Sequence, residues 1–523
     1  MRLLAVLAVP LVPLGLSLAC VHRLERTVTP QLVTVDHEVP YLKVHMKNGD
    51  LFVLSAWQAD EPHKQVTGHG EQLGADRVRV RAGEHRIAMA DVALYETNTI
   101  VTSPSIAAMA VVTGASIALS VVCLANPKTC FGSCPTFYAP GPPGTPGPPG
   151  TPGPPDERGA EEVLLQAEGF SDAISPALES HDVDALWRSH VTDGRLTLRM
   201  TNEAYETHVV KRADVLAVPR PPGTRVLSTG EALWLASTVA PPTGCTAPEG
   251  DCTGVLAGVD GRERTSLTDA DDLAARETIE LAFPAAAPGG RTGIVIAARP
   301  SLVTTFLLYQ GLAYLGTTAV AWLATLERGD IAARVGGRKL QGLVGGIEVQ
   351  IPHGTGWLTV GEAYETGPLA TDVHLIVLPD QALGERVRLR LPRGGWRIDH
   401  VARAALAHEV TPQRIAPQAI RGTLGREFAA ERVPATQLPI VTQPGDAYEL
   451  DYAIPRGEVE LFLDTRGYYL EWMRAEWLRE EQPLEALKMF LDPAQAMRDL
   501  APAWKRMEPE AEQLFWRSRY ANP

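Results

Sequence analysis

A repeated segment constrains the fold of this chain more than any other feature. The pentapeptide Glu203–Thr207 recurs letter for letter as Glu362–Thr366, and each copy follows a short run in which apolar and polar residues alternate. Each copy is followed by an Asp-Val run that ends in proline, Asp214–Pro219 and Asp372–Pro379. Ordered agreement of this kind indicates two copies of one unit. The alternating runs and the Pro/Gly turns predict that each unit is a β-sandwich-like module.

The carboxyl groups of the repeated pentapeptide could act as a catalytic pair, because two close carboxyls can transfer protons. Glu203 and Glu206 are three positions apart, however, which places them on opposite faces of a strand. His208 follows the first copy, whereas Gly367 follows the second. We therefore interpret the pentapeptide as structural. We predict no catalytic, cofactor-binding or metal-binding residue, since the common phosphate-loop, nucleophile-elbow, zinc-helix and dinucleotide motifs are missing from the sequence.

Short alternating runs also fill residues 41–97, ahead of the repeat. The turn Asn48-Gly49-Asp50 separates two of these runs, and Asn-Gly in such a place is a strong hairpin signal. Runs of this length and spacing predict a small barrel of about five strands over residues 21–103. Barrels of this size commonly serve as scaffolds or binding platforms.

The first twenty residues have the pattern of a lipoprotein signal. Met1-Arg2 supplies a positive start, an apolar stretch follows, and Ala19 directly precedes Cys20. We predict cleavage before Cys20 and acylation of its thiol, which would anchor the mature chain outside the cytoplasm. The next residues, Val21-His22, lack an Asp retention signal, which favours the outer membrane in a Gram-negative host. An uncleaved anchor or an ordinary secretory signal stays open as an alternative.

Composition limits the kinds of partner. The 523 residues are 45% hydrophobic and 21% charged, so the chain is globular and can bury two or three cores. Its formal net charge of -14 argues against nucleic acid or an anionic lipid surface as the main partner, because both require clustered Lys and Arg. We expect a protein partner in the cell envelope and no cofactor.

The cysteines form two local couples. Apart from Cys20 and from Cys123, which lies in an apolar run, they are Cys130 with Cys134 and Cys245 with Cys252. In an exported chain each couple predicts a disulfide across a short loop. A zinc site is the alternative, but neither couple has further His or Cys residues at ligand spacing beside it.

Two long stretches carry no charge. The first, Ile106 to Ala125, has the length of a membrane span, although its Ala- and Ser-rich composition weakens insertion. A lipid on Cys20, a single crossing at this stretch and a disulfide between Cys130 and Cys134 are incompatible, because the crossing would place the couple in the reducing cytosol. We predict that residues 104–126 form a helix that packs on the protein or dips into the membrane, and a true span stays open.

The second uncharged stretch, Leu302 to Leu326, contains many hydroxyl and amide side chains. It therefore predicts a buried helix, which we place at residues 301–330.

Between Pro140 and Pro155 glycine recurs at every third residue, with proline in most other positions. This is the composition of collagen, but five triplets are too few to hold a triple helix unaided. We predict a stiff polyproline spacer within residues 127–163, and a trimerisation element is the alternative.

Near the C-terminus, two alternating runs predict final strands, with Gly467-Tyr468-Tyr469 as a turn. From Leu470 onward, large apolar residues follow a helical spacing. The predicted fold is mainly β with added helices: a small N-terminal barrel, two related β-sandwich-like modules and C-terminal helices. The predicted boundaries are signal 1–20, barrel 21–103, apolar helix 104–126, linker 127–163, first module 164–300, buried helix 301–330, second module 331–465 and C-terminal helices 466–523.

Part of the chain resembles a widespread family of functionally uncharacterised bacterial envelope proteins, many of them lipoproteins. The resemblance rests on Ser133-Cys134-Pro135, on Ala167–Ser171 and on Asn202–His208, and it is strongest over residues 128–230. It implies β modules and an envelope location, and it brings no known catalytic residue. Unlike the usual pattern of the family, this chain inserts the collagen-like tract between the first two of these segments.

The leading functional expectation is a non-enzymatic envelope lipoprotein that presents β modules for protein contact. One alternative is a hydrolase of envelope polymers that uses carboxyl groups in the modules. Another is a membrane-spanning subunit of a transport or assembly complex, with Ile106 to Ala125 as the span.

Overall fold

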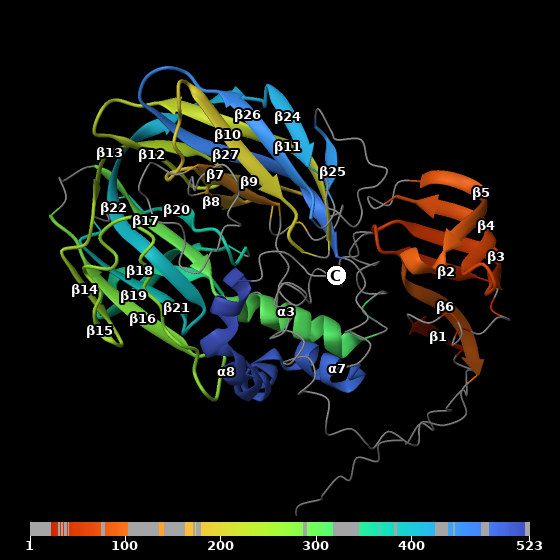
Figure 1. Cartoon of the computed structure of the whole chain (residues 1–523). Coiled ribbons are helices and arrows are strands. Elements are labelled where there is room, and N and C mark those ends of the chain that lie inside the picture. Colours follow the sequence, from red (N-terminus) through yellow and green to blue (C-terminus); the bar gives the residue numbers. More distant parts are fainter. Residues whose placement is uncertain are drawn as a thin grey trace, which may run out of the picture.

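The computed structural model has five antiparallel sheets and three α-helices in the part of the chain that it describes (Figure 1). The prediction of a mainly β fold with added helices is confirmed. Cys20, Cys123, Cys130, Cys134, the stretch from Ile106 to Ala125 and most of the collagen-like tract lie outside the described residues. These are 22–29, 32, 35, 39, 41–74, 79–102, 135–140, 163–170, 173, 179–204, 206–285, 290–316, 319, 345–365, 367–380, 384–423, 438–442, 445–471 and 481–517.

The N-terminal sheet is a half barrel of six strands in the order β1-β6-β2-β3-β4-β5. The predicted hairpin at Asn48-Gly49 is confirmed, since it joins β2 to β3 and Gly49 has a φ of 81°. Gly70 lets two strands approach closely, because a Cβ there would lie 2.0 Å from the carbonyl oxygen of Val53. The strands are β1 (His22–Thr29), β2 (Leu42–Met46), β3 (Leu51–Asp60), β4 (Gln65–Leu73), β5 (Arg79–Ala88) and β6 (Val92–Thr102).

Two sheets form a first sandwich. The first outer sheet has the order β24-β26-β10-β7-β8, and the first inner sheet has the order β23-β11-β27-β9, with β25 also beside β11. The strands of the outer sheet are β7 (Thr136–Pro140), β8 (Val163–Glu168), β10 (Arg195–Thr201), β24 (Ala419–Thr423) and β26 (Ala447–Ala453). Those of the inner sheet are β9 (Ser180–Ala185), β11 (Glu206–Pro219), β23 (Gln413–Ile415), β25 (Ile440–Thr442) and β27 (Val459–Glu471).

Two further sheets form a second sandwich. The second inner sheet has the order β12-β13-β22-β17-β20, and the second outer sheet has the order β15-β14-β16-β21-β18-β19. The strands of the inner sheet are β12 (Arg225–Ser228), β13 (Leu233–Ala240), β17 (Arg291–Pro300), β20 (Asp372–Val377) and β22 (Trp396–Val410). Those of the outer sheet are β14 (Gly244–Ala247), β15 (Gly250–Asp251), β16 (Arg276–Ala282), β18 (Ile347–His353), β19 (Gly356–Ala363) and β21 (Arg386–Pro392).

The predicted disulfide between Cys245 and Cys252 is confirmed. It links β14 to the residue that follows β15, with 5.0 Å between the two Cα atoms. Both cysteines are buried in the core of the second sandwich.

The two sandwiches stack through their inner sheets and form four layers with three apolar cores. Successive side chains of a strand point to opposite faces of the sheet, so an inner strand contributes side chains to two cores. On β17, Ile294 and Ile296 face the core of the second sandwich, whereas Val295 faces the core between the inner sheets. On β27, Leu461 faces the core of the first sandwich and Phe462 faces the same middle core. Both inner sheets are therefore buried on both faces.

The two sandwiches do not coincide with the predicted modules 164–300 and 331–465. β11 pairs with β27 from Glu206 opposite Glu471 to Pro219 opposite Val459, so the first sandwich combines residues 136–219 with residues 413–471. The second sandwich uses residues 225–410 between them. The pentapeptide copies still hold equivalent places, because each leads from an outer-sheet strand (β10 or β19) to an inner-sheet strand (β11 or β20).

The predicted turn at Gly467–Tyr469 is wrong, because these residues belong to β27 and pair with β11. A Cβ at position 467 would lie 2.2 Å from the carbonyl oxygen of Val209. The glycine therefore permits a close approach of two backbones next to a bulge in β11, and it does not reverse the chain.

Three helices cover one end of the sheet stack: α3 (Leu302–Leu315), α7 (Pro483–Leu491) and α8 (Pro493–Arg517) (Figure 1). They share a core that includes Phe306 of α3 and Trp504 of α8, whose rings are 5.3 Å apart. α3 is buried, as predicted, and the Ser301 side chain caps it by accepting the N–H of Val303. The helix is shorter than the predicted 301–330, because it ends at Leu315 and Gly316 follows with a φ of 51°; residues 320–330 lie outside the described residues. None of the helices in the described residues has the length and apolarity needed to cross a membrane.

Candidate functional site

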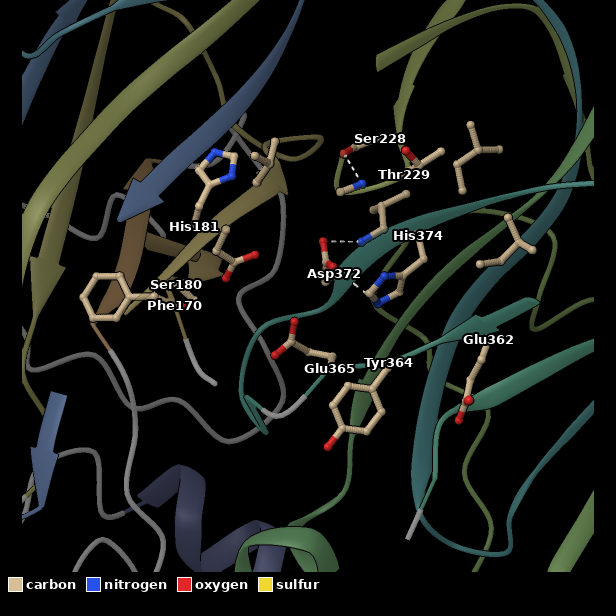
Figure 2. A pocket seen from close by; sticks show the side chains of 16 residues that line it. Phe170, Ser180, His181, Ser228, Thr229, Glu362, Tyr364, Glu365, Asp372 and His374 are labelled. Carbon is tan, nitrogen blue, oxygen red and sulfur yellow. Dashed lines mark hydrogen bonds and ion pairs between the residues drawn. The ribbon is translucent and has the colours of Figure 1, made fainter. Parts of the chain in front are cut away.

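A cavity of about 280 Å³ lies where β9 of the first inner sheet meets β12 and β20 of the second inner sheet (Figure 2). Residues of both sandwiches line it, including the second copy of the repeated pentapeptide. The lining consists of Phe170, Ser180–Val183 of β9, Ser228–Gly230 at the end of β12, Glu362, Tyr364 and Glu365 of the pentapeptide, and Asp372–Ile376 of β20.

The lining includes four carboxyls and two imidazoles: Asp182, Glu362, Glu365, Asp372, His181 and His374. Figure 2 shows the carboxyls of Glu365 and Asp372 directed toward the same space. Asp372 Oδ2 lies 3.3 Å from His374 Nε2, and Glu365 accepts the N–H of Gly367 at 2.8 Å. His181 Nε2 lies 2.9 Å from the buried carboxyl of Asp464 on β27, so this imidazole also contacts the first inner sheet.

A short loop, residues 367–371, joins the pentapeptide to β20 and sets the position of Asp372. Glu168 Oε2 accepts the N–H groups of Leu369 at 2.6 Å and Ala370 at 3.2 Å. A Cβ on Gly367 would lie 2.6 Å from the same oxygen. This contact explains why the second copy carries glycine where the first copy carries His208.

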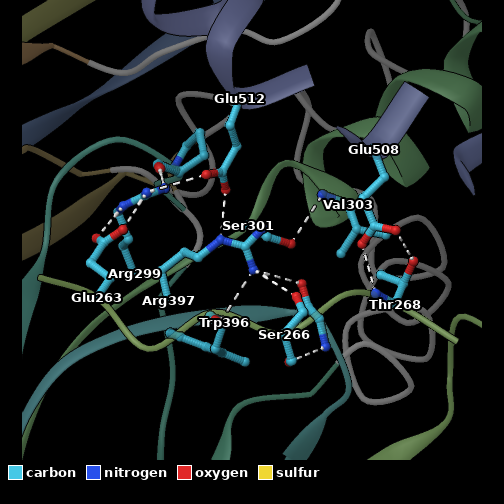
Figure 3. Close-up of polar contacts among 12 residues, drawn as sticks. Glu263, Ser266, Thr268, Arg299, Ser301, Val303, Trp396, Arg397, Glu508 and Glu512 are labelled. Atoms are coloured by element: carbon cyan, nitrogen blue, oxygen red, sulfur yellow. Dashed lines mark hydrogen bonds and ion pairs between the residues drawn. The ribbon is translucent and has the colours of Figure 1, made fainter. Parts of the chain in front are cut away.

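Arg299 also contacts this loop, and Figure 3 shows its guanidinium beside Glu263 and Glu512. Its guanidinium donates to the carbonyl oxygen of Pro368 at 3.0 Å and makes two hydrogen bonds of 2.7 Å to Glu263. Glu512 of α8 lies 3.7 Å away and also accepts a hydrogen bond of 2.8 Å from Arg397. The loop that leads into the cavity is thus linked to the helical layer through partly buried ionic contacts.

Asp184 lies beside the cavity on β9 and is 4% exposed. It follows Ser180 and Asp182 at intervals of two, so its side chain leaves the strand on the same face as theirs. Its Oδ2 is buried and has no hydrogen-bond partner among the described residues. Burial, together with the nearby carboxyls of Asp182, Asp372, Glu365 and Glu168, raises the pKa of Asp184 well above its usual range.

The raised pKa of Asp184 predicts a specific pH dependence of stability. In the unfolded chain Asp184 titrates at about pH 3.9. Between that value and the folded pKa, the folded protein keeps a proton that the unfolded chain has lost. The stability contribution of this group therefore falls as the pH rises through that interval, with a limiting slope of about 1.4 kcal/mol per pH unit. Asp184→Asn removes the titration, so we expect its stability relative to wild type to increase with pH.

Urea unfolding at a series of pH values between 4 and 8 measures this effect. Asp380→Asn is the matched control, because the Asp380 side chain is 84% exposed. A stability difference between Asp184→Asn and wild type that does not change with pH would contradict the expectation.

The carboxyls of the first copy of the pentapeptide do not line the cavity, whereas Glu362 and Glu365 of the second copy do. Glu203 and Glu206 are each 1% exposed and belong to a separate buried network. Tyr138 donates to Glu203 at 2.7 Å, and His208 Nε2 lies 2.9 Å from Glu206 Oε1.

Sequence patterns did not identify Asp182 and Asp372 as neighbours in a cavity lining, or Asp184 as a residue beside it. The only local signal was the alternation of Asp182 and Asp184 on a short strand, and Asp372 is 190 positions further along the chain. No group of three or more His, Cys, Asp or Glu side chains in the described part of the chain has the arrangement of a metal site.

Comparisons with known proteins add no functional information. No protein-family model matches the sequence, and no curated protein matches it. Among solved structures, the arabinofuranosyltransferase AftD from Mycobacteria is similar at 14% sequence identity and a TM-score of 0.16, over 85% of this chain and 32% of that protein. The chain therefore spans about a third of the length of that enzyme. A score this low carries no argument about fold or activity.

Proposed function

We propose that this chain is an extracytoplasmic binding protein, anchored in a membrane through Cys20, and that its cavity receives a projecting group of a protein partner. The supporting observation is the position of the cavity, which draws its lining from both sandwiches at the junction of the two inner sheets. Recesses between packed units of a fold are common ligand sites, and a rigid lining lowers the entropic cost of binding. Because the inner sheets are buried on both faces, they hold the lining in place.

A hydrolase that uses carboxyl groups is the second candidate. The raised pKa of Asp184 next to Asp182 favours it, because paired acids in different environments can act as proton donor and acceptor. Asp184 does not line the cavity, however, so a ligand in the cavity does not meet its carboxyl directly. For this reason we place binding first. The proposal of a membrane-spanning subunit depends on Ile106 to Ala125, which lie outside the described residues.

Site-specific cross-linking in the native host tests the binding function. A photoreactive phenylalanine analogue replaces Tyr364 in the cavity or, as a matched control, Tyr41 on the N-terminal sheet, which is 57% exposed. We expect a discrete adduct with one envelope protein at position 364 and not at position 41. Equal adducts at both positions, or none at position 364, would contradict the proposal.

A Cys20→Ser variant in the same host tests the anchor. We expect this variant to leave the membrane fraction, and we expect its intact mass to lack the mass of the lipid. A Cys20→Ser chain that stays in the membrane would contradict anchoring through this residue.

A further inference from the structure

The half barrel ends in an open edge at β5 (Figure 1). Among the described residues this strand pairs with β4 and with no other strand. Its ten residues make it the longest edge strand of the described sheets. An edge strand carries a row of backbone N–H and C=O groups that can accept a further strand. No proline lies between Arg79 and Ala88 to prevent such pairing.

The register with β4 shows which backbone groups of β5 face the open edge. The N–H of Met89 donates to the carbonyl oxygen of Lys64 at 2.9 Å, and this pair continues the ladder in which Gln65 lies opposite Ala88. In an antiparallel ladder every second residue of a strand exchanges hydrogen bonds with the neighbouring strand. The residues in between direct their N–H and C=O groups away from β4, and these are Ala82, Glu84, Arg86 and Ala88.

These four side chains lie on the face of the sheet that points away from the core, because His85 and Ile87 between them are buried. The first three of the four are exposed to solvent. Gly83 has no side chain, and nothing lies within 4 Å of the place where a Cβ would be. A strand can therefore approach this edge without displacing buried groups of the half barrel.

The charges on β5 favour one partner and one register. When two copies of β5 pair antiparallel about a two-fold axis at His85, Glu84 of each copy lies opposite Arg86 of the other. Ala82 then lies opposite Ala88, so every outward-facing residue meets an outward-facing residue and can exchange hydrogen bonds with it. A two-fold axis at Glu84 or at Arg86 would instead place like charges directly opposite each other, which destabilises a sheet.

We propose that β5 pairs with β5 of a second copy of this chain, so that two half barrels form one continuous antiparallel sheet. A two-fold contact of this kind uses the same surface on both copies and leaves neither β5 with an open edge. Opposite charges at Glu84 and Arg86 set its register. The proposal does not depend on the proposed binding function, since β5 belongs to the half barrel and the cavity is lined by the two sandwiches.

Disulfide cross-linking of the full chain in its native host tests the register. Opposite residues that exchange hydrogen bonds have Cα atoms about 5.5 Å apart, which suits a disulfide. The double variant Ala82→Cys/Ala88→Cys is therefore expected to give a covalent dimer, in which mass spectrometry finds position 82 of one copy linked to position 88 of the other. Each single substitution is the matched control, because in this register equal positions of the two copies lie about 20 Å apart along the strands.

Three outcomes of the cross-linking would overturn the proposal. They are the absence of a dimer linked through positions 82 and 88, equal dimer formation by a single variant, and a link from these positions to a different protein in place of a second copy.

Charge reversal tests the same contact without a covalent bond. Sedimentation of the purified full chain in detergent measures the dissociation constant of the dimer. Glu84→Arg and Arg86→Glu each place like charges opposite each other, and each is expected to weaken the dimer at least about tenfold. The double variant Glu84→Arg/Arg86→Glu restores opposite charges and is expected to recover an affinity within about threefold of wild type. A mixture of the two single variants is expected to form mixed dimers for the same reason.

Lys47→Glu is the matched control for charge reversal, because Lys47 is exposed in the turn between β2 and β3. We expect this variant to dimerise as wild type does. Thermal unfolding checks that each variant folds, and the cysteine pair decides if a charge variant does not. A wild-type chain that is monomeric at every concentration, single reversals that leave the dimer unchanged, or a double reversal no better than the single ones would overturn the proposal.

Discussion

Replacing Arg299 with alanine is expected to lower the free energy of unfolding by about 3–5 kcal/mol. Arg299 is 5% exposed, and its guanidinium lies between Glu263 and Glu512. Burial disfavours its charge, but the two carboxylates outweigh this effect and raise the pKa of Arg299. Removing the guanidinium leaves Glu263 without this cation and the Pro368 carbonyl without this donor, whereas Glu512 keeps its hydrogen bond from Arg397. Uncompensated charge in a buried place is the physical reason for the large effect.

The same substitution is expected to disturb the cavity, because Pro368 belongs to the loop that leads to Asp372. Urea unfolding followed by tryptophan fluorescence measures the loss of stability. Arg262→Ala is the matched control, since the Arg262 side chain is 75% exposed in its pair with Asp260, and we expect little change in stability there. An Arg299→Ala chain as stable as wild type would show that the contacts of Arg299 in Figure 3 do not help to hold the helical layer on the second sandwich.

Phe462→Ala is expected to cost about 3–5 kcal/mol, because it empties space in the core between the inner sheets. Phe462 is 0% exposed, and it pairs with Leu216 of β11 on one side and with Ala185 of β9 on the other. β9 also carries Ser180–Val183 of the cavity lining. We therefore expect this variant to weaken ligand binding as well as the fold.

Two further substitutions calibrate that result. Phe462→Leu keeps most of the volume and is expected to cost less than about 1.5 kcal/mol. Leu358→Ala, at a position that is 45% exposed on the second outer sheet, is expected to change stability by less than about 0.5 kcal/mol. If Phe462→Ala cost no more than Leu358→Ala, the inner sheets would not share a tightly packed core.

Local patterns predicted several elements well. The Asn48-Gly49 hairpin, the buried helix that starts at Leu302 and the disulfide between Cys245 and Cys252 each depend on residues close together in the chain. The prediction of a turn at Gly467–Tyr469, which was based on a glycine followed by two aromatic residues, was wrong. The partner that makes this segment a strand is β11, more than 200 residues earlier, and no local signal encodes that pairing.

The amino-acid sequence by itself determined the strand-rich composition, the repeated unit and the chemistry of the lining residues, because spacing and residue type are local properties. Only the tertiary structure decided that β11 pairs with β27, that the two sandwiches share a middle core and that Asp182 meets Asp372 across a cavity. These outcomes arise from burying apolar faces of segments far apart in the chain, and the energy of that burial depends on the whole packed arrangement rather than on any one segment.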